Sequence, residues 1–206
     1  MKNILASFSA ALLLIACQSA TESENTNHQE NTNQEEEHQN FGTTVTMGGE
    51  PVQTIGKLPE VGSQAIDFSL ADKDMGDKSL SDFAGKNIIL NIFPSVDTKV
   101  CSESVRTFNE KAANLNNTAV LCISKDLPFA QERFCGAEGI ENVTMLSDFR
   151  SDFGEKYGVE IGEGPMKGLL SRAVVVIDPE GKVVYEEQVT ELSHEPDYTA
   201  ALEAVK

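Results

Sequence analysis

One cysteine, Cys101, stands where a turn gives way to a helical pattern, and its neighbours could make it reactive. Thr98 precedes it by three residues and can act as the N-cap of that helix, which places Cys101 in the first turn. The unpaired N–H groups of a first turn carry partial positive charge and stabilise a thiolate, the nucleophilic form of cysteine. Since cysteine is often only a small core residue, its surroundings must decide its role.

Burial of the thiolate calls for a nearby cation, because a low dielectric disfavours the charged form. Cys101 begins an apolar stripe at helical spacing, so we expect a partly buried pocket around it. Four cations are candidates for its partner: Lys99, Arg106, Arg133 and Arg172. Spacing does not choose among them. Composition alone favours an ordinary exposed charge for Arg172, at the start of an apolar strand, because a buried guanidinium without an anionic partner is costly.

The other cysteines form no recognisable metal or redox pair. The chain has four, Cys17, Cys101, Cys122 and Cys135, and no two have CxxC spacing. The three histidines do not combine with them at zinc spacing, so we predict no metal site. Cys122 lies in the apolar run "TAVLCIS" and is expected to be a packed core thiol.

Length and charge narrow the possible functions. The 206 residues suggest one domain with extensions. A formal net charge of -17 argues against nucleic acid as a partner, since phosphates need Lys and Arg. It argues equally against charge-driven docking on anionic lipid.

The N-terminal 40 residues are expected to lie outside the folded domain. Residues 1–16 combine Lys2, a short apolar run and small residues, as in a secretory signal peptide. The following Cys17, in the string Leu-Ile-Ala-Cys, resembles the acylated cysteine of bacterial lipoprotein signals. Residues 18–40 hold six Glu and no Lys or Arg, so residues 17–40 are predicted to be an acylated, disordered acidic tether. This predicts a lipid-anchored protein of the bacterial cell envelope, facing the periplasm or the exterior.

The elements that position Cys101 follow an α/β pattern. Two β-prone runs around Gly48 and Gly49 predict an N-terminal hairpin. The apolar runs at 87–93 and 118–124 fit central strands covered on both faces, and a second hairpin is expected at 172–187. Helical patterns follow at 98–115, 128–139, 147–159 and 195–206. Residues 41–206 are thus predicted to form a thioredoxin-like core with an added N-terminal β-hairpin.

The stretch "PSVDTKVC", residues 94–101, matches the Pro-x-x-x-Thr-x-x-Cys signature of the peroxiredoxins. The blocks "DLPFAQERFCGAEG" and "GPMKGLLSRAVVVID" further resemble bacterial thiol peroxidases, the atypical 2-Cys branch of that family. The resemblance runs from about Thr43 to the C-terminus. It therefore covers the whole predicted domain.

This resemblance implies a role for each matching residue. Cys101 would be the peroxidatic cysteine, Thr98 would contact its thiolate and the peroxide, and Pro94 would shield it from solvent. Arg172 would stabilise the thiolate, which replaces the expectation drawn from composition. Cys135 would be the resolving cysteine. Lys99 departs from the pattern, because many members carry proline there, and its effect on the active-site loop is left open.

The implied reaction reduces hydrogen peroxide or an organic hydroperoxide. Cys101 would become a sulfenic acid that condenses with Cys135 to a disulfide, and a thioredoxin-like protein would reduce that bond. No metal, haem or flavin cofactor is required, and a homodimer is implied by resemblance alone. Because both cysteines fall in predicted helices, we expect local unwinding of the two segments during turnover.

Two other readings remain open at this point. A thiol–disulfide oxidoreductase on the same fold is the main alternative, although such enzymes typically use a CxxC pair. A non-catalytic lipoprotein that kept the fold is the second. Metal capture by the acidic segment would at most be weak, because scattered Glu give no rigid cage.

Overall fold

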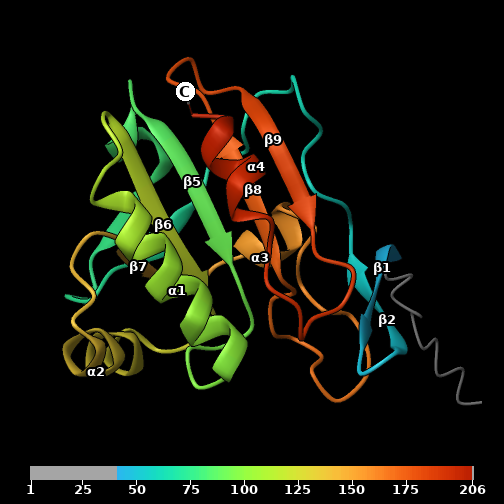
Figure 1. Ribbon diagram of the computed structural model, residues 1–206. Coiled ribbons are helices and arrows are strands. Elements are labelled where there is room, and N and C mark those ends of the chain that lie inside the picture. The colour runs from blue at the N-terminus through green and yellow to red at the C-terminus, as the bar shows by residue number, and fades with distance from the viewer. Residues whose placement is uncertain (1–40, 206) are drawn as a thin grey trace, which may run out of the picture. The chain divides into compact units, whose positions relative to one another are not determined.

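The computed structural model describes residues 41–205. The predictions for the signal peptide, for Cys17 and for the acidic tether lie outside these residues. The centre of the described part is a seven-stranded sheet in the order β4-β3-β7-β6-β5-β8-β9 (Figure 1). Its strands are β3 (Ser69–Ala71), β4 (Asp77–Ser79), β5 (Asn87–Ile92), β6 (Thr118–Ser124), β7 (Thr144–Ser147), β8 (Ala173–Ile177) and β9 (Val183–Gln188).

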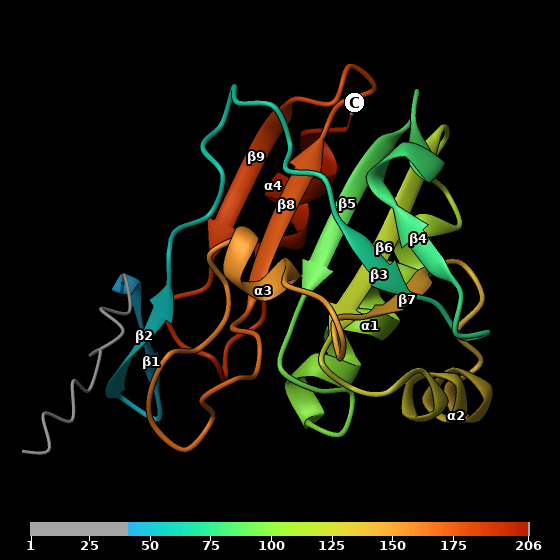
Figure 2. The ribbon, with the colours of Figure 1, turned by 180° about the vertical axis from the view of Figure 1, so that it is seen from behind.

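Helices cover both faces of this sheet, which explains why the central strands are apolar throughout. α1 (Lys99–Ala112) and α4 (Tyr198–Glu203) lie on one face, and α3 (Phe153–Lys156) lies on the other (Figures 1 and 2). In β5, Ile88, Leu90 and Ile92 join the core beneath α3, whereas Ile89 packs in the core beneath α1. This alternation is the two-residue period of a strand.

The predicted N-terminal hairpin is present as β1 (Phe41–Met47) and β2 (Glu50–Ile55), a separate two-stranded sheet. The two residues that connect its strands, Gly48 and Gly49, both have positive φ, 61° and 87°. A two-residue turn of this kind favours glycine because residues with a Cβ rarely adopt that backbone. The edge of β1 bonds to the segment after β9, since Leu192 N–H donates to Thr46 O at 2.9 Å. The hairpin is thereby held beside residues 190–192.

The sheet topology brings three segments together at one edge. β5 and β6 run parallel, with Ile92 beside Ile123, so the loops that follow them leave the sheet at the same edge. β8 runs antiparallel to β5 and pairs Ala173 with Ile92, so the residue before β8 lies at that edge too. The loop after β5 leads into α1, and the loop after β6 leads into α2 (Pro128–Glu138).

Most predicted elements are confirmed, and the differences are in length. The helical pattern at 147–159 yields only the single turn of α3, and the edge strand β3 has three residues. A 3₁₀ turn, η1 (Leu80–Phe83), was not predicted. α2 ends where Gly139 adopts a left-handed φ of 66°, as its glycine indicated.

Candidate active site

Cys101 is the third residue of α1 and is completely buried, with 0% of its surface exposed. This is deeper than the partly buried position predicted from the sequence. Its sulfur accepts a hydrogen bond from Nη2 of Arg172 at 3.3 Å. The carbonyl of Cys101 accepts from Ser104 Oγ at 2.9 Å, which ties the first turn of α1 to its second. The hydrogen bond from Arg172 therefore fixes the direction of the Cys101 side chain and places a positive charge beside its sulfur.

Arg172 lies immediately before β8 and is only 1% exposed. The expectation from composition, a strand-end charge in water, is therefore wrong. Its Nε and Nη2 donate to the carbonyl of Leu192 at 3.2 and 3.0 Å, which orients the guanidinium toward the sulfur. No carboxylate balances it in the contacts of the described residues. A buried cation without a carboxylate gains most from an anion beside it, and the atom in that position is the sulfur of Cys101.

The other three candidate cations do not reach Cys101 by any contact in the described chain. Arg106 forms exposed ion pairs with Glu103 and Glu138, and their carboxylates raise its pKa. Lys99 and Arg133 are exposed. Of the four cations named from the sequence, Arg172 is thus the one that the fold places in contact with Cys101.

Thr98 occupies the N-cap position of α1, as predicted, but its side chain makes no capping hydrogen bond. Its Oγ1 instead donates to the carbonyl of Ser95 at 3.2 Å. This geometry leaves the hydroxyl oxygen as an acceptor near Cys101. Thr98 lines a pocket of about 220 Å³ together with Pro94 and Arg172. The sequence-predicted residues Thr98, Pro94, Arg172 and Cys101 are thereby brought to one place.

The pocket has one polar end and a largely apolar remainder. Its lining comprises Met47, Pro94, Thr98, Lys99, Val100, Met166, Arg172, Leu192 and Ser193. Met47 comes from β1, so the N-terminal hairpin supplies part of the wall. A hydroperoxide would meet donors at the Arg172 end and apolar side chains around the rest. Arg172 Nη1 is buried and has no hydrogen-bond partner among the described residues, so it is a free donor at this end.

Sequence reasoning missed the residues that hold these groups in place. Leu192 was missed because it acts through its carbonyl, which no residue type reveals. Asp126 was also missed, although its carboxylate accepts from Val96 N–H and Ser95 Oγ, both at 2.8 Å. A signal existed in this case, since Asp126 follows β6 at the edge where the loop after β5 begins.

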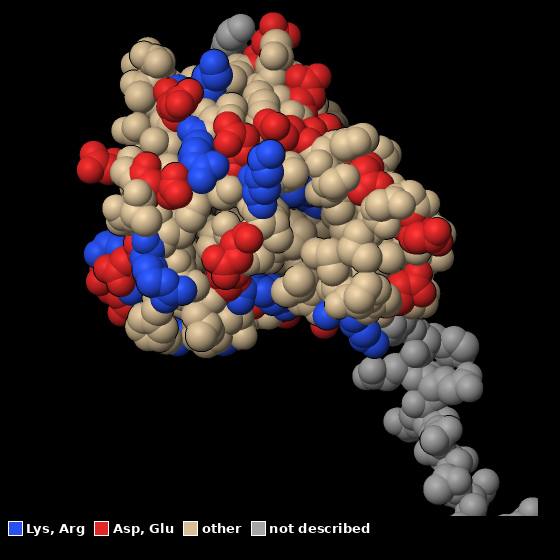
Figure 3. All heavy atoms as spheres, turned by 60° about the horizontal axis from the view of Figure 1, so that its bottom comes forward, with Lys and Arg blue, Asp and Glu red and all other residues tan. Residues whose placement is uncertain are grey.

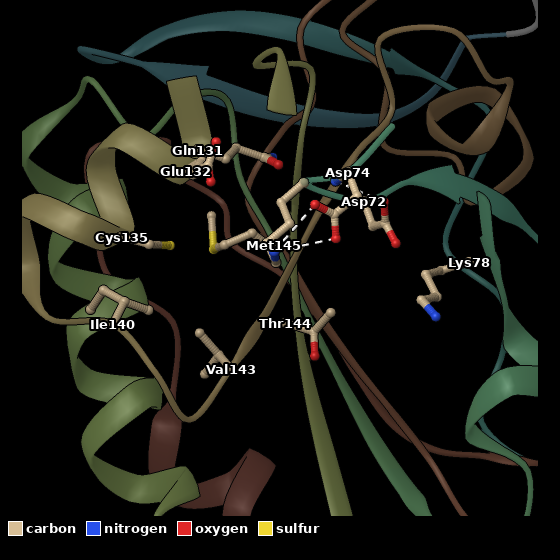
Figure 4. A pocket seen from close by; sticks show the side chains of 11 residues that line it. Asp72, Asp74, Lys78, Gln131, Glu132, Cys135, Ile140, Val143, Thr144 and Met145 are labelled. Carbon is tan, nitrogen blue, oxygen red and sulfur yellow. Dashed lines mark hydrogen bonds and ion pairs between the residues drawn. The ribbon is translucent and has the colours of Figure 1, made fainter. Parts of the chain in front are cut away.

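Cys135 lies in the last turns of α2 and is partly buried. Figure 4 shows its side chain directed into a second pocket, of about 430 Å³, toward Met145. Burial and the carboxylate of Glu132 raise the pKa of Cys135. It is unpaired, like the other described cysteines, and neither Cys135 nor Cys101 is among the residues that line the pocket beside Arg172. Cys101 belongs to the core beneath α1 and Cys135 packs against the margin of the same core, where it lines the second pocket.

Cys122 is confirmed as a core thiol. It is 0% exposed within the core beneath α1, and its sulfur accepts from Asn91 Nδ2 at 3.5 Å. Burial raises its pKa to about 12, so it stays protonated at neutral pH. Cys122 lines neither of the two pockets described above.

The surface around the end of the molecule where α2 lies mixes both signs of charge. In Figure 3 Lys and Arg stand beside Asp and Glu, with uncharged areas between them. Within residues 41–205 no helix is long and apolar enough to cross a bilayer. The same part of the chain contains no cluster of three side chains suited to hold a metal ion.

Comparisons with known proteins agree with this geometry. The model of the Redoxin family matches residues 60–202. A thiol peroxidase of Mycobacterium tuberculosis is 57% identical over 161 residues, which are 78% of this chain and 97% of the relative. A thiol peroxidase of Corynebacterium glutamicum is 57% identical over 157 residues, 76% of this chain and 95% of its own.

Solved structures give the same result. A peroxiredoxin-like protein from Aquifex aeolicus superposes with a TM-score of 0.76 at 42% identity and covers 80% of this chain and 96% of its own. A thiol peroxidase from Chromobacterium violaceum reaches a TM-score of 0.73 at 26% identity, covering 79% and 95%. The chain therefore belongs to the Redoxin family, and its fold is the thioredoxin-like fold of peroxiredoxins. Within that family it is a peroxiredoxin of the thiol peroxidase type, an enzyme that reduces peroxides with electrons from thiols.

Proposed function

We propose that Cys101 is the thiol that attacks the peroxide and that Cys135 resolves the product. The observation that carries this assignment is the hydrogen bond, at 3.3 Å, from the buried Arg172 to the sulfur of the fully buried Cys101. The Cys101 thiolate attacks one peroxide oxygen, the O–O bond breaks, and the other oxygen leaves with a proton as water or an alcohol. Preorganised donors stabilise the charge on those oxygens without reorganising at the moment of reaction.

Three groups have the positions to serve that step. The buried Arg172 Nη1 is free to donate to the peroxide. The hydroxyl oxygen of Thr98, whose proton is engaged by Ser95, can accept the hydrogen of the incoming hydroperoxide. Pro94 forms part of the wall and limits access of water. The apolar remainder of the pocket supports organic hydroperoxides as substrates alongside hydrogen peroxide.

The second step joins the two cysteines. The Cys135 sulfur attacks the sulfenic acid of Cys101, an S–S bond forms, and the hydroxyl leaves as water. A thioredoxin-like dithiol protein then reduces the disulfide by exchange. A thiol–disulfide oxidoreductase is less well supported, because the reactive thiol is fully buried and the chain has no CxxC pair.

Mass spectrometry after one equivalent of peroxide tests both assignments. We expect a peptide pair linked through Cys101 and Cys135, and a trapped sulfenic acid on Cys101 in the Cys135→Ser variant. A disulfide that includes Cys122, or a sulfenic acid on Cys135, would refute the assignment. Steady-state turnover with and without a thioredoxin system identifies the class of reductant.

We propose further that Cys17 is acylated and tethers the domain through residues 18–40 to the membrane of the bacterial cell envelope, facing the periplasm or the exterior. The support is the sequence Leu-Ile-Ala-Cys after a signal-like segment, and the acidic composition that follows it. Metabolic labelling with a fatty-acid analogue tests the proposal. Label on the wild-type chain that disappears in Cys17→Ser supports it, and an unlabelled wild-type chain refutes it.

A homodimer is the third proposal. Leu127 and Phe129, around the start of α2, are 50% and 56% exposed, which is unusual for large apolar side chains. A second copy that covers them would remove this surface from water. Sedimentation of the wild-type protein and of Phe129→Ser tests the idea: we expect a dimer that the substitution weakens, and a monomeric wild-type protein would overturn it.

A further inference from the structure

The carboxylate of Asp126 lies between the turn that precedes α1 and the strand end that precedes α2. It accepts three hydrogen bonds, from Val96 N–H, Ser95 Oγ and Ser124 Oγ, each at 2.8 Å. Two of these donors belong to the loop after β5, and the third closes β6. Hydrogen bonds to an ionised acceptor are the strong ones among protein hydrogen bonds. Asp126 therefore fastens the loop after β5 to the end of β6.

The network continues from Ser124 into α2. Gln131 is a buried residue of α2, one turn before Cys135, so the two side chains share a face of the helix. Its Nε2 donates to Ser124 Oγ at 3.1 Å and to the Leu146 carbonyl at 2.9 Å. These contacts hold the helix that carries Cys135 against the end of the sheet.

On its other side the network reaches the start of α1. The carbonyl of Ser95 accepts from both N–H and Oγ1 of Thr98, each at 3.2 Å. Thr98 in turn caps the helix through its carbonyl, which accepts from Ser102 N–H at 3.0 Å. An unbroken series of hydrogen bonds thus joins Gln131, four residues before Cys135, to Thr98, three residues before Cys101.

This connection matters because both proposed disulfide partners are unpaired and held within helices in the structure. Cys101 is buried in α1, Cys135 is in α2, and a disulfide requires Cα atoms roughly 4.4–6.8 Å apart with suitable Cβ directions. Both helices must unwind locally, and the shared network resists the unwinding of each. Resting on the proposed Cys101–Cys135 chemistry, we propose that Asp126 is a positioning residue: it couples the release of α2 to the release of α1 and so sets the rate of disulfide formation.

The sulfenic acid has two fates, and the coupling decides between them. Attack by the Cys135 sulfur forms the S–S bond and releases water. Attack by the Cys101 sulfenate on a second hydroperoxide breaks that O–O bond, gives a sulfinic acid and releases a second water or alcohol. The second fate requires the folded pocket, with Arg172 and Thr98 in place. A tight network therefore slows resolution and favours sulfinic acid at high peroxide, and a loose network has the opposite effect.

The test measures that partition in Asp126→Asn. An amide lacks the charge and keeps one acceptor oxygen, so the network weakens without a large change in volume. Samples mixed with increasing peroxide are quenched with acid, alkylated and analysed by mass spectrometry for sulfenic acid, disulfide and sulfinic acid. We expect disulfide formation about fivefold faster than in the wild-type protein, as the net loss of one ordinary hydrogen bond implies. The sulfinic fraction should fall by a similar factor.

Asp178→Asn is the matched control. Asp178 also accepts several hydrogen bonds in a loop, from Glu180 N–H at 3.0 Å and Lys182 N–H at 2.8 Å, but it lies in the turn between β8 and β9. It should lower the melting temperature in the same manner and leave the partition unchanged. Equal partitions in the two variants would show that Asp126 has only a structural role and would overturn the coupling.

Two further variants keep the test decisive. Ser95→Ala removes one bond to Asp126 and provides a milder change if Asp126→Asn folds poorly; it should shift the partition in the same direction. Gln131→Leu should also accelerate disulfide formation, and its combination with Asp126→Asn should give less than the product of the two effects. Multiplicative effects would contradict one coupled network. A wild-type protein that forms no Cys101–Cys135 disulfide would instead refute the proposed function, and the coupling with it.

Discussion

The two thiols of the proposed reaction both lie in helices, and their surroundings favour opposite charge states. Cys101 is in the first turn of α1, where unpaired N–H groups favour negative charge, and Arg172 adds a full positive charge at 3.3 Å. Cys135 is near the C-terminal end of α2, where its own carbonyl accepts from Ile140 N–H at 3.1 Å. The partial charge at that end is negative, and Glu132 adds more.

This difference in surroundings distinguishes the proposed attacking thiol, Cys101, from the proposed resolving thiol, Cys135. The Cys101 sulfur accepts a hydrogen bond from a guanidinium, as the proposed attacking thiol requires, whereas the raised pKa of Cys135 keeps that thiol protonated and poorly reactive toward peroxide. Cys135 gains reactivity only when α2 unwinds and its sulfur leaves the helix end. The position of Cys101 at the start of α1 and of Cys135 near the end of α2 therefore favours attack on peroxide by Cys101 before resolution by Cys135.

Replacing each of the two cysteines by serine should have the largest effect on peroxide reduction and should affect the two steps differently. Cys101→Ser should abolish peroxide reduction, because a serine hydroxyl is not ionised near neutral pH and Arg172 would face a neutral group. Cys135→Ser should still consume one equivalent of peroxide before it stops at the sulfenic acid. Peroxide consumption at equimolar enzyme measures both results. Loss of the first equivalent in Cys135→Ser, in a folded protein, would contradict the division of roles.

Removing the cation weakens only the Cys101 side. Arg172→Gln should slow the reaction with peroxide by about a hundredfold or more, the usual cost of losing a preorganised donor to developing charge. Single-turnover loss of free thiol measures the rate. Arg106→Gln is the control, since its guanidinium pairs with Glu103 and Glu138 at the surface and should matter little. A rate for Arg172→Gln within a fewfold of the Arg106→Gln rate would remove the electrostatic argument.

Removing the negative charge of Glu132 beside Cys135 should have a smaller effect, on the rate of disulfide formation. Glu132 raises the pKa of Cys135, so Glu132→Gln lowers it and increases the thiolate fraction at a given pH below that pKa. We expect disulfide formation about twofold faster at pH 7, with the advantage disappearing above the pKa. Rapid quenching across a pH series measures it, with the exposed Glu141→Gln as control. A slower rate in Glu132→Gln would show that the carboxylate has another role.

The sequence predicts the strands and helices around the two thiols better than the residues that hold the thiols' neighbours in place. The strands from 87 and 118 and the helix that begins at Lys99 follow from apolar periodicity and capping residues, and the structure has each of their first residues within one residue of the prediction. The cation was left among four candidates by the residues alone, because pairing of β8 with β5 decides it and such pairing is not a local property. The resemblance selected Arg172, and in the structure this residue donates a hydrogen bond to the Cys101 sulfur.

Other features could not be read because they depend on backbone atoms or on two distant segments. The carbonyl of Leu192 orients Arg172 from 20 residues away, and any residue type would serve. Thr98 sits at the cap position that its type indicates, yet its hydroxyl turns to Ser95, because the tight turn from Ser95 to Thr98 offers a nearer acceptor. Asp126 differs, since a carboxylate just after an apolar strand could have been recognised as a loop anchor.

A third thiol, Cys122, shows the effect of burial on a cysteine in this protein, because neither a cation nor a carboxylate contributes to its pKa. Burial raises its pKa to about 12, so between its unfolded value of about 8.5 and pH 12 the unfolded chain loses this proton and the folded chain keeps it. Stability from this group is thus complete below about pH 8.5 and falls as pH rises, by about 2 kcal/mol at pH 10. Cys122→Ala removes that dependence and should leave turnover at pH 7 unchanged.

Urea unfolding under reducing conditions measures the effect at pH 7 and pH 10. At pH 7 the alanine variant should be less stable by about 1 kcal/mol, the common cost of a core truncation. At pH 10 the difference should vanish or reverse, because the wild-type protein has then lost the stability contributed by its protonated Cys122, while the other titrating groups are the same in both proteins. A constant difference at the two pH values would mean that Cys122 titrates alike in the folded and unfolded chains. Burial alone would then be too weak to hold a thiol neutral in this core, and the protonated state of the half-buried Cys135 would have to rest on Glu132 and the end of α2.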